Sequence, residues 1–191
     1  GDAGDEELSA DPNSLAGKVL RLNPDGTAPG DNPDVGDPRV YSYGHRNPQA
    51  ITFLPDGTPV VTEHGPSARD EVVVVERGRN HGWPEVRSGG EDDQYGRYGE
   101  SDGVTNPLVN TGPEETWAPS GGVFYTGSAV PALRNRLLVG GLRSQTLFSI
   151  SVHGGDAPDM GGARYDDAWL HSDYESVAHD LFADELGRIR H

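Results

Sequence analysis

Residues 44–83 read GHRNPQAITFLPDGTPVVTEHGPSARDEVVVVERGRNHGW, and this stretch decides the fold. Residues 50–54 and 58–62 are short runs that contain β-branched side chains, and Pro-Asp-Gly at 55–57 separates them. Such a turn between two strand-like runs predicts a β-hairpin. Residues 72–75 are four consecutive valines, a pattern typical of a strand that is buried on both faces. The stretch therefore predicts three short strands.

Strand-like segments continue on both sides of this hairpin. We expect strands over residues 18–23, 40–43, 122–125, 136–140, 146–152 and 177–182, and no helix. Two polar excursions, near 87–115 and 153–175, interrupt them. A strand closed by an Asp/Gly turn recurs as RLNPDGT, FLPDGTP and FADELGR. This recurrence suits a β-propeller, whose blades take ~40–45 residues, so that 191 residues would hold about four. A β-sandwich has similar strands but rarely two polar excursions of this length.

Composition excludes several classes of function. The formal net charge of -16 predicts repulsion from nucleic acid and from anionic membrane surfaces. No apolar run is long enough to span a membrane. The absence of cysteine excludes disulfides and thiolate metal sites. The fifteen Lys and Arg residues include a single lysine, Lys18. An acidic surface that prefers Arg to Lys is typical of adaptation to high salt.

Polar side chains gather at the open end of the predicted hairpin. His45, Arg46, Asn47 and Gln49 precede or begin its first strand, and Glu63, His64, Asp70 and Glu71 end or follow its second. A structural turn needs none of these groups. A rim that combines guanidinium, amide, imidazole and carboxylate predicts the wall of a ligand site.

The order R-N-P-Q, E-H-G-P, D-E and N-x-G-W-P resembles that of the soluble glucose/sorbosone (aldose sugar) dehydrogenases. The resemblance runs from residue 1 to 191. It implies part of a six-bladed propeller, a single domain that lacks the N-terminal blades and the last strands of the family fold. It also implies pyrroloquinoline quinone (PQQ) and Ca²⁺ as cofactors. The expected reaction oxidises the anomeric carbon of an aldose to a lactone and passes electrons to an external acceptor, outside the cytoplasm.

The resemblance assigns cofactor contacts to seven residues. PQQ is a planar quinone with three carboxylates, which arginine pairs well because its guanidinium is planar and bidentate. The implied PQQ-binding residues are Arg46, Asn47, His64, Thr116, Arg143, Arg188 and Arg190. At position 64 some family members have Gln; an imidazole can still hydrogen-bond a quinone or sugar oxygen.

Calcium ligands are implied at two places. The carbonyls of Gly65 and Pro66 would hold the Ca²⁺ that touches the quinone, and oxygen donors suit this hard cation. Glu71 and the carbonyl of His81 would hold a second, structural Ca²⁺. His81 stands where the family more often has Tyr, and a backbone ligand tolerates that exchange.

The resemblance gives Asp70 a catalytic role, that of orienting a histidine base, as carboxylates do in catalytic triads. That histidine lies upstream of the G-D-A-G segment with which this sequence opens, so we expect the 191 residues alone to be inactive. Two alternatives stay open. One is a non-catalytic propeller that serves as a binding module. The other is a calcium-dependent propeller lactonase, which would need Asp, Glu and Asn ligands but no cluster of cofactor-facing arginines.

Overall fold

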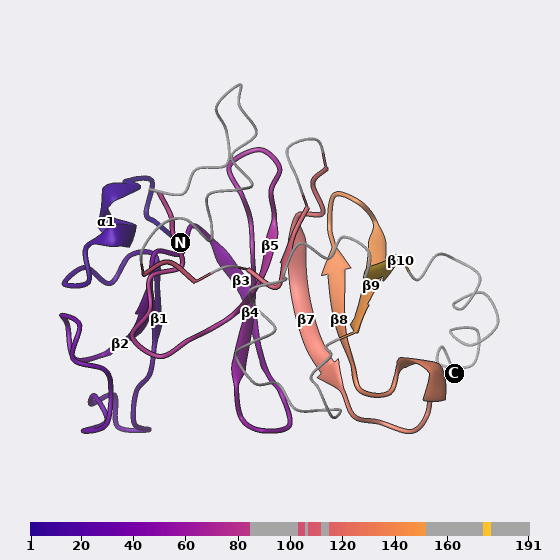
Figure 1. Ribbon diagram of the computed structural model, residues 1–191, viewed down its shortest axis with the longest axis horizontal. Coiled ribbons are helices and arrows are strands. Elements are labelled where there is room, and N and C mark those ends of the chain that lie inside the picture. Colours follow the sequence, from indigo (N-terminus) through magenta and orange to yellow (C-terminus); the bar gives the residue numbers. More distant parts are fainter. Residues whose placement is uncertain (85–102, 106, 112–114, 152–173, 177–191) are drawn as a thin grey trace.

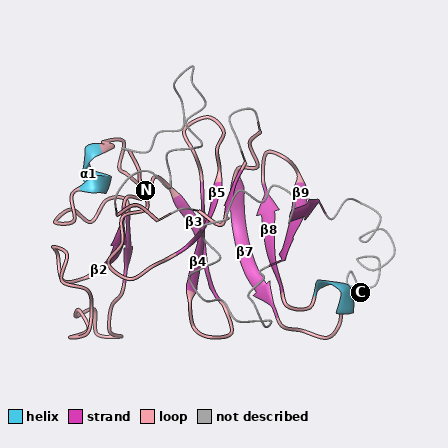
Figure 2. Cartoon of the chain, in the orientation of Figure 1, coloured by secondary structure: helices cyan, strands magenta, loops and turns pink. Residues whose placement is uncertain are grey.

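The structure is a computed structural model that describes residues 1–84, 103–105, 107–111, 115–151 and 174–176. Its secondary structure is nearly all strand (Figure 2). The elements are α1 (Glu7–Ala10), β1 (Lys18–Leu20), β2 (Val40–Tyr43), β3 (Pro48–Phe53), β4 (Pro59–Glu63), β5 (Glu71–Val74), β6 (Val109–Asn110), β7 (Pro119–Tyr125), a 3-10 turn (Pro131–Leu133), β8 (Arg136–Gly141), β9 (Thr146–Ser151) and β10 (Tyr174–Ser176).

The strands form three sheets that lie side by side in the order of the chain (Figure 1). A two-stranded sheet pairs β1 with β2. Two four-stranded sheets follow, with the orders β3-β4-β5-β6 and β10-β9-β8-β7, and every neighbouring pair is antiparallel. Successive antiparallel four-stranded sheets are the blades of a propeller. The expected fold class, an all-β partial propeller, is confirmed.

The predicted hairpin is present and is fixed by its turn. The N–H of Leu54 donates to the carbonyl of Thr58 at 2.9 Å, and Gly57 adopts a φ of 88°. A left-handed φ of this kind favours glycine. The first strand begins at Pro48, two residues earlier than expected, because Pro48 already pairs with Glu63 in the register.

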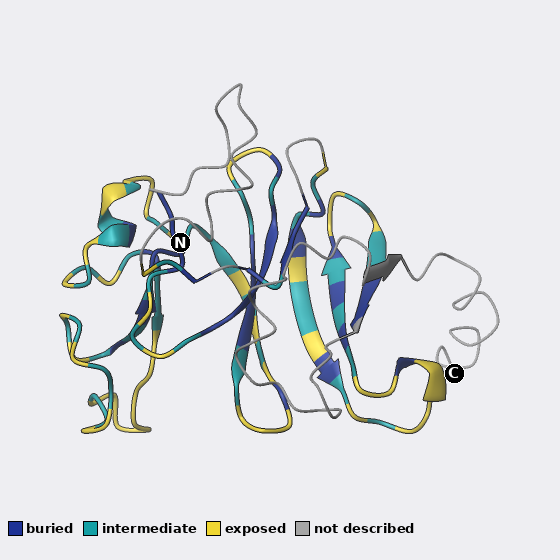
Figure 3. Cartoon of the chain, viewed as in Figure 1, coloured by how far each residue is buried: buried dark blue, intermediate teal, exposed yellow. Residues whose placement is uncertain are grey.

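The predicted two-sided burial of the valine run is also confirmed. Val72 and Val74 pack on one face of the sheet, in a cluster that includes Trp117 and Phe148 from the next blade. Val73 and Val75 pack on the opposite face, where side chains of the β1–β2 sheet cover them. The buried residues therefore concentrate in the two interfaces between sheets (Figure 3).

Three short elements differ from the sequence expectation. Helix α1 has four residues, although we expected no helix. Strand β6 lies inside the excursion 87–115, and its two residues become a strand because they pair with β5. Strand β10 begins within the excursion 153–175. The strand expected over 177–182 lies outside the described residues.

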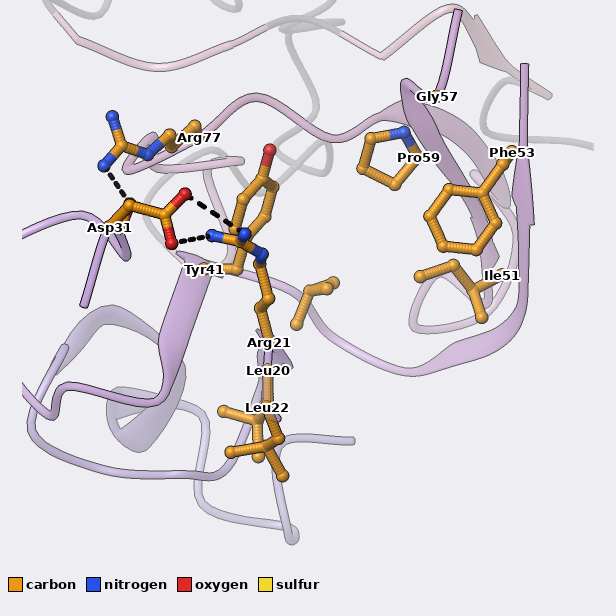
Figure 4. A pocket seen from close by; sticks show the side chains of 11 residues that line it. Leu20, Arg21, Leu22, Asp31, Tyr41, Ile51, Phe53, Gly57, Pro59 and Arg77 are labelled. Carbon is orange, nitrogen blue, oxygen red and sulfur yellow. Dashed lines mark hydrogen bonds and ion pairs between the residues drawn. The ribbon is translucent and has the colours of Figure 1, made fainter. Parts of the chain in front are cut away.

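One face of β3 is covered and the other is open. On the covered face, the hydroxyl of Thr52 accepts the N–H of Phe124 from β7. On the open face, Ile51 is 51% exposed and Phe53 is 58% exposed. These two side chains line a groove of about 640 Å³ toward the β1–β2 sheet, where Arg21 forms an ion pair with Asp31 (Figure 4).

The groove does not coincide with the predicted site. It lies near the turn of the β3–β4 hairpin, whereas the predicted site residues lie at the opposite end, where Pro48 pairs with Glu63. In the part of the chain that the structure describes, no helix is long and apolar enough to cross a membrane.

Candidate functional site

The open end of the β3–β4 hairpin places Arg46 and His64 side by side. The N–H of His64 donates to the carbonyl of Asn47 at 3.1 Å, which extends the strand pairing by one bond. The guanidinium of Arg46 donates to the carbonyls of His64 at 3.1 Å and Gly65 at 2.7 Å. Two backbone oxygens of this turn therefore face a cation.

Asp70 forms hydrogen bonds with segments that adjoin both four-stranded sheets. Its Oδ1 accepts the N–H of Gly65 at 3.0 Å. Its Oδ2 accepts the Thr116 hydroxyl and the N–H groups of Trp117 and Ala118 at 2.7–2.8 Å. The carboxylate is buried, so these four donors replace the water that it would otherwise bind. Asp70 thus fixes the turn after β4 and the segment that enters β7.

The rim continues onto the second four-stranded sheet. The imidazole Nε2 of His64 lies 2.9 Å from the carbonyl of Pro119, the first residue of β7. The N–H of Arg143, in the turn after β8, donates to the carbonyl of Trp117 at 3.1 Å, and the Arg143 side chain is exposed. Arg46, His64, Asp70 and Thr116 therefore border one region, and the backbone of Arg143 adjoins it through Trp117.

Asp2 belongs to this region, and our sequence analysis missed it. Its N–H donates to the carbonyl of Arg46 at 2.7 Å, and its Oδ2 accepts the indole N–H of Trp83 at 3.1 Å. The guanidinium of Arg46 lies over the Trp83 ring, 5.5 Å from the centroid. No local pattern places a carboxylate next to a residue 81 positions later. The available signal was the G-D-A-G segment, which we used only as a landmark.

A buried polar group lies beneath the rim. Oε2 of Glu63 is 3.3 Å from Nδ1 of His45, and Nε2 of His45 lies 2.8 Å from the hydroxyl of Ser42. Burial raises the pKa of Glu63 to about 8 and lowers the pKa of His45 to about 3. Both groups are therefore neutral near pH 6, and neutral forms avoid the cost of buried charge.

The turn after β4 presents two backbone oxygens to a positive group. The carbonyl oxygens of His64 and Gly65 converge on a positive group, here the guanidinium of Arg46. A Cβ on Gly65 would collide with the carbonyl oxygens of Ala68 and Arg69, so the turn needs glycine. Pro66 is exposed beside it. Backbone carbonyls are among the oxygen donors that Ca²⁺ uses, and the calcium role of Gly65 and Pro66 stays a prediction.

The second predicted calcium position involves Glu71 and His81. Oε1 of Glu71 accepts the side-chain amide of Asn110 at 2.8 Å, and Glu71 lies opposite Glu63 in the sheet register. The imidazole of His81 is buried and stacks on His45 with 4.6 Å between ring centroids. Among the described residues, no three His, Asp or Glu side chains gather as metal ligands. The roles of Glu71 and His81 stay predictions, and Arg188 and Arg190 lie outside the described residues.

Comparison with known proteins identifies relatives of this chain. The curated relatives include quinoprotein glucose dehydrogenase B of Acinetobacter calcoaceticus, which is 41% identical over 54% of this chain and 22% of its own length. They also include the aldose sugar dehydrogenase YliI of Escherichia coli, which is 29% identical over 84% of this chain and 45% of its own length.

Solved structures share the fold. One is described as the PQQ-bound form of aldose sugar dehydrogenase from Streptomyces coelicolor; it has a TM-score of 0.69 and 29% identity and covers 95% of this chain and 45% of its own. Another, described as a glucose dehydrogenase, has a TM-score of 0.71 and 33% identity and covers 81% of this chain and 46% of its own. The chain spans less than half the length of these proteins.

The sequence profile of one family, described as Glucose / Sorbosone dehydrogenase, matches residues 1–191. This match includes every residue of the rim, from Asp2 to Arg143. The chain belongs to the glucose/sorbosone dehydrogenase family.

Proposed function

We propose that this chain is part of a PQQ- and calcium-dependent aldose dehydrogenase. The reaction would oxidise the anomeric carbon of a sugar to a lactone and pass electrons to an external acceptor, in a location outside the cytoplasm. The observation that carries the proposal is the rim itself. One guanidinium, from Arg46, faces the carbonyls of His64 and Gly65, and Asp70 ties that turn to the next blade.

Different residues of the rim would bind PQQ and Ca²⁺. We propose that Arg46 and Arg143 pair the carboxylates of PQQ, joined by Arg188 and Arg190, with Asn47 and Thr116 beside them. The carbonyls of Gly65 and Pro66 hold Ca²⁺ against the quinone. A bound PQQ supplies the hydride acceptor of the reaction. The imidazole of His64 orients a quinone or sugar oxygen by a hydrogen bond.

Asp70 has a defined part in this arrangement. We propose that it orients a histidine base of the full-length protein. Its two oxygens already accept four hydrogen bonds within this chain. It therefore also holds the calcium-binding turn and Thr116 at fixed positions. Such support matters because catalytic geometry must be held within a fraction of an ångström.

A binding titration tests the proposal. PQQ is added to the full-length protein in the presence of Ca²⁺, and the dissociation constant is compared for wild type, Arg46→Met and Arg21→Met. Arg21 is the matched control. It is an arginine that lines the groove, away from the predicted site, and it forms an ion pair with Asp31. Loss of a charge-assisted pair costs about 1.5–3 kcal/mol, or roughly a 10- to 150-fold weaker affinity.

Each outcome has a distinct meaning. A loss confined to Arg46→Met supports the PQQ site. Equal affinities in all three proteins would reject Arg46 as a cofactor ligand. Lactone hydrolysis without PQQ would replace the proposal with the lactonase alternative. Tight sugar binding without oxidation would replace it with the binding module.

A further inference from the structure

The ammonium group of Lys18 donates all of its hydrogen bonds to backbone carbonyls. Nζ donates to the carbonyl oxygens of Leu8 at 2.8 Å, Ser9 at 2.9 Å and Ala16 at 2.6 Å. An ammonium group has three N–H donors, so none is left over. The side chain is half-buried. Two of the acceptors belong to α1, which lies beside the β1–β2 sheet (Figure 1).

The identity of this residue is informative because the chain otherwise avoids lysine. Fifteen residues are Lys or Arg, and Lys18 is the only lysine. Three carbonyls that converge on one point match a compact ammonium, whereas a guanidinium is a planar fork whose donors point outward. Burial lowers the pKa of Lys18 to about 8, so the group remains charged at pH 6.5.

The segment that Lys18 holds leads directly to the candidate site. The N–H of Gly17 donates to the carbonyl of Gly1 at 2.9 Å, and the N–H of His45 donates to the carbonyl of Gly17 at 3.1 Å. A Cβ on Gly17, whose φ is 63°, would collide with the hydroxyl of Ser9 and the carbonyl of His45. The segment is therefore packed closely against the residue that precedes Arg46.

Asp2 follows Gly1, whose carbonyl accepts the N–H of Gly17, and Asp2 reaches the rim. Its N–H binds the carbonyl of Arg46, and its carboxylate accepts the indole N–H of Trp83. We propose that Lys18 is a positioning residue for the candidate site, whose ammonium holds residues 8–16 and, through the hydrogen bond between Gly17 and Gly1, keeps Asp2 against Arg46 and Trp83. The role of the site rests on the proposed function, but the effect of Lys18 on the position of Asp2 can be measured without cofactor.

The indole N–H of Trp83 provides the measurement. The protein is labelled with ¹⁵N-tryptophan at pH 6.5 without PQQ, and the Trp83 signal is assigned with Trp83→Phe. Lys18→Ala is expected to move the Trp83 signal toward that of an indole without a carboxylate partner. Trp117 is an internal control, because its indole N–H donates to Glu115 far from Lys18 in sequence. Arg21→Ala is a control for the loss of one positive charge outside the segment.

Chemical rescue separates positioning from general stability. Ethylammonium carries three N–H donors and can enter the space left in Lys18→Ala, so it is expected to restore the Trp83 signal. Tetramethylammonium has the same charge and no donor, and it is expected to restore nothing. Rescue by both ions would overturn the proposal. A Lys18→Ala protein that is destabilised but keeps the wild-type Trp83 signal would also overturn it.

A measurement on the wild-type protein covers the case in which Lys18→Ala does not fold. Acylation requires the unprotonated amine, and the lowered pKa of Lys18 increases that fraction, so rates are compared per unprotonated amine. On that basis an amine-acylating reagent is expected to modify Lys18 at least tenfold more slowly than a free lysine derivative. Modification at the rate of the free derivative would overturn the proposal. Absence of PQQ binding alongside the expected Trp83 shift would instead reject the proposed function and leave the role of Lys18 intact.

Discussion

The carboxylate of Asp70 accepts the backbone N–H of Trp117 at 2.7 Å, although the two residues precede strands of different blades. Three further donors, from Gly65, Thr116 and Ala118, converge on the same side chain. One buried carboxylate thus links both halves of the rim, and its removal should affect both.

We predict that Asp70→Asn destabilises the protein and weakens PQQ binding. The amide must turn its NH₂ group toward at least one backbone donor, and a buried donor left without a partner costs about 1–3 kcal/mol. Chemical denaturation measures this cost. The control is Asp56→Asn, an exposed residue that also accepts a backbone N–H, for which we expect a change within about 0.5 kcal/mol. Equal effects of the two substitutions would contradict the linking role of Asp70.

The turn after β4 gives a second prediction. Gly65→Ala should abolish calcium-supported PQQ binding, because the added methyl group collides with two carbonyl oxygens of the same turn. Gly121→Ala is the matched control, since a Cβ at Gly121 meets no atom within 4 Å. Crystallography or calorimetry of the two variants decides the point. Normal binding by Gly65→Ala would show that this turn does not hold the metal.

The raised pKa of Glu63 predicts that the stability of the protein depends on pH. Its pKa is raised from an ordinary 4.5 to about 8, so the folded protein binds the extra proton and the free energy of unfolding falls as the pH rises through 8. His45 has its pKa lowered to about 3 and contributes a change only below about 6.5. The window from pH 6.5 to 8 therefore reports mainly on Glu63, because Lys18, whose pKa is lowered to about 8, opposes the fall only near its upper end.

We expect Glu63→Gln to remove most of the fall in unfolding free energy between pH 6.5 and 8, measured in buffer with EDTA. The control is Asp34→Asn, which changes an exposed carboxylate and should leave the slope unchanged. A wild-type slope in Glu63→Gln would show that the carboxyl is ionised in the folded protein.

The open groove predicts self-association of the 191-residue chain. Exposed apolar side chains that share a groove favour contact with another surface, and Ile51 and Phe53 are both more than half exposed. Phe53→Lys should therefore weaken association by at least tenfold in analytical ultracentrifugation. Leu142→Lys is the control, because Leu142 is 70% exposed outside the groove. Equal weakening by both substitutions would point to charge alone.

Local chemistry explains which parts of the fold were predictable. The Pro-Asp-Gly turn and the valine run each determine their structure within a few residues, and both appear as expected. Strand β6 was not predictable because Val109 and Asn110 form a strand only by pairing with β5. Helix α1 is too short to show a helical period.

The residue types of the candidate site were predictable from the sequence, but the contacts between them were not. The hairpin pairing alone brings Asn47, the residue after Arg46, opposite His64. The four partners of Asp70 and the contact between Asp2 and Trp83 join segments that are up to 81 residues apart, so tertiary structure alone sets them. Lys18 was visible as the only lysine, but its three acceptors were not.

The most direct test of the central claim is dye-linked oxidation of aldoses by the full-length protein. We predict that dye reduction requires both PQQ and Ca²⁺, and that the 191-residue chain gives none under the same conditions. Loss of a general base typically costs about 10²–10⁴ in rate. Sugar oxidation that proceeds without PQQ, or turnover by the 191-residue chain comparable with that of the full-length protein, would contradict the account.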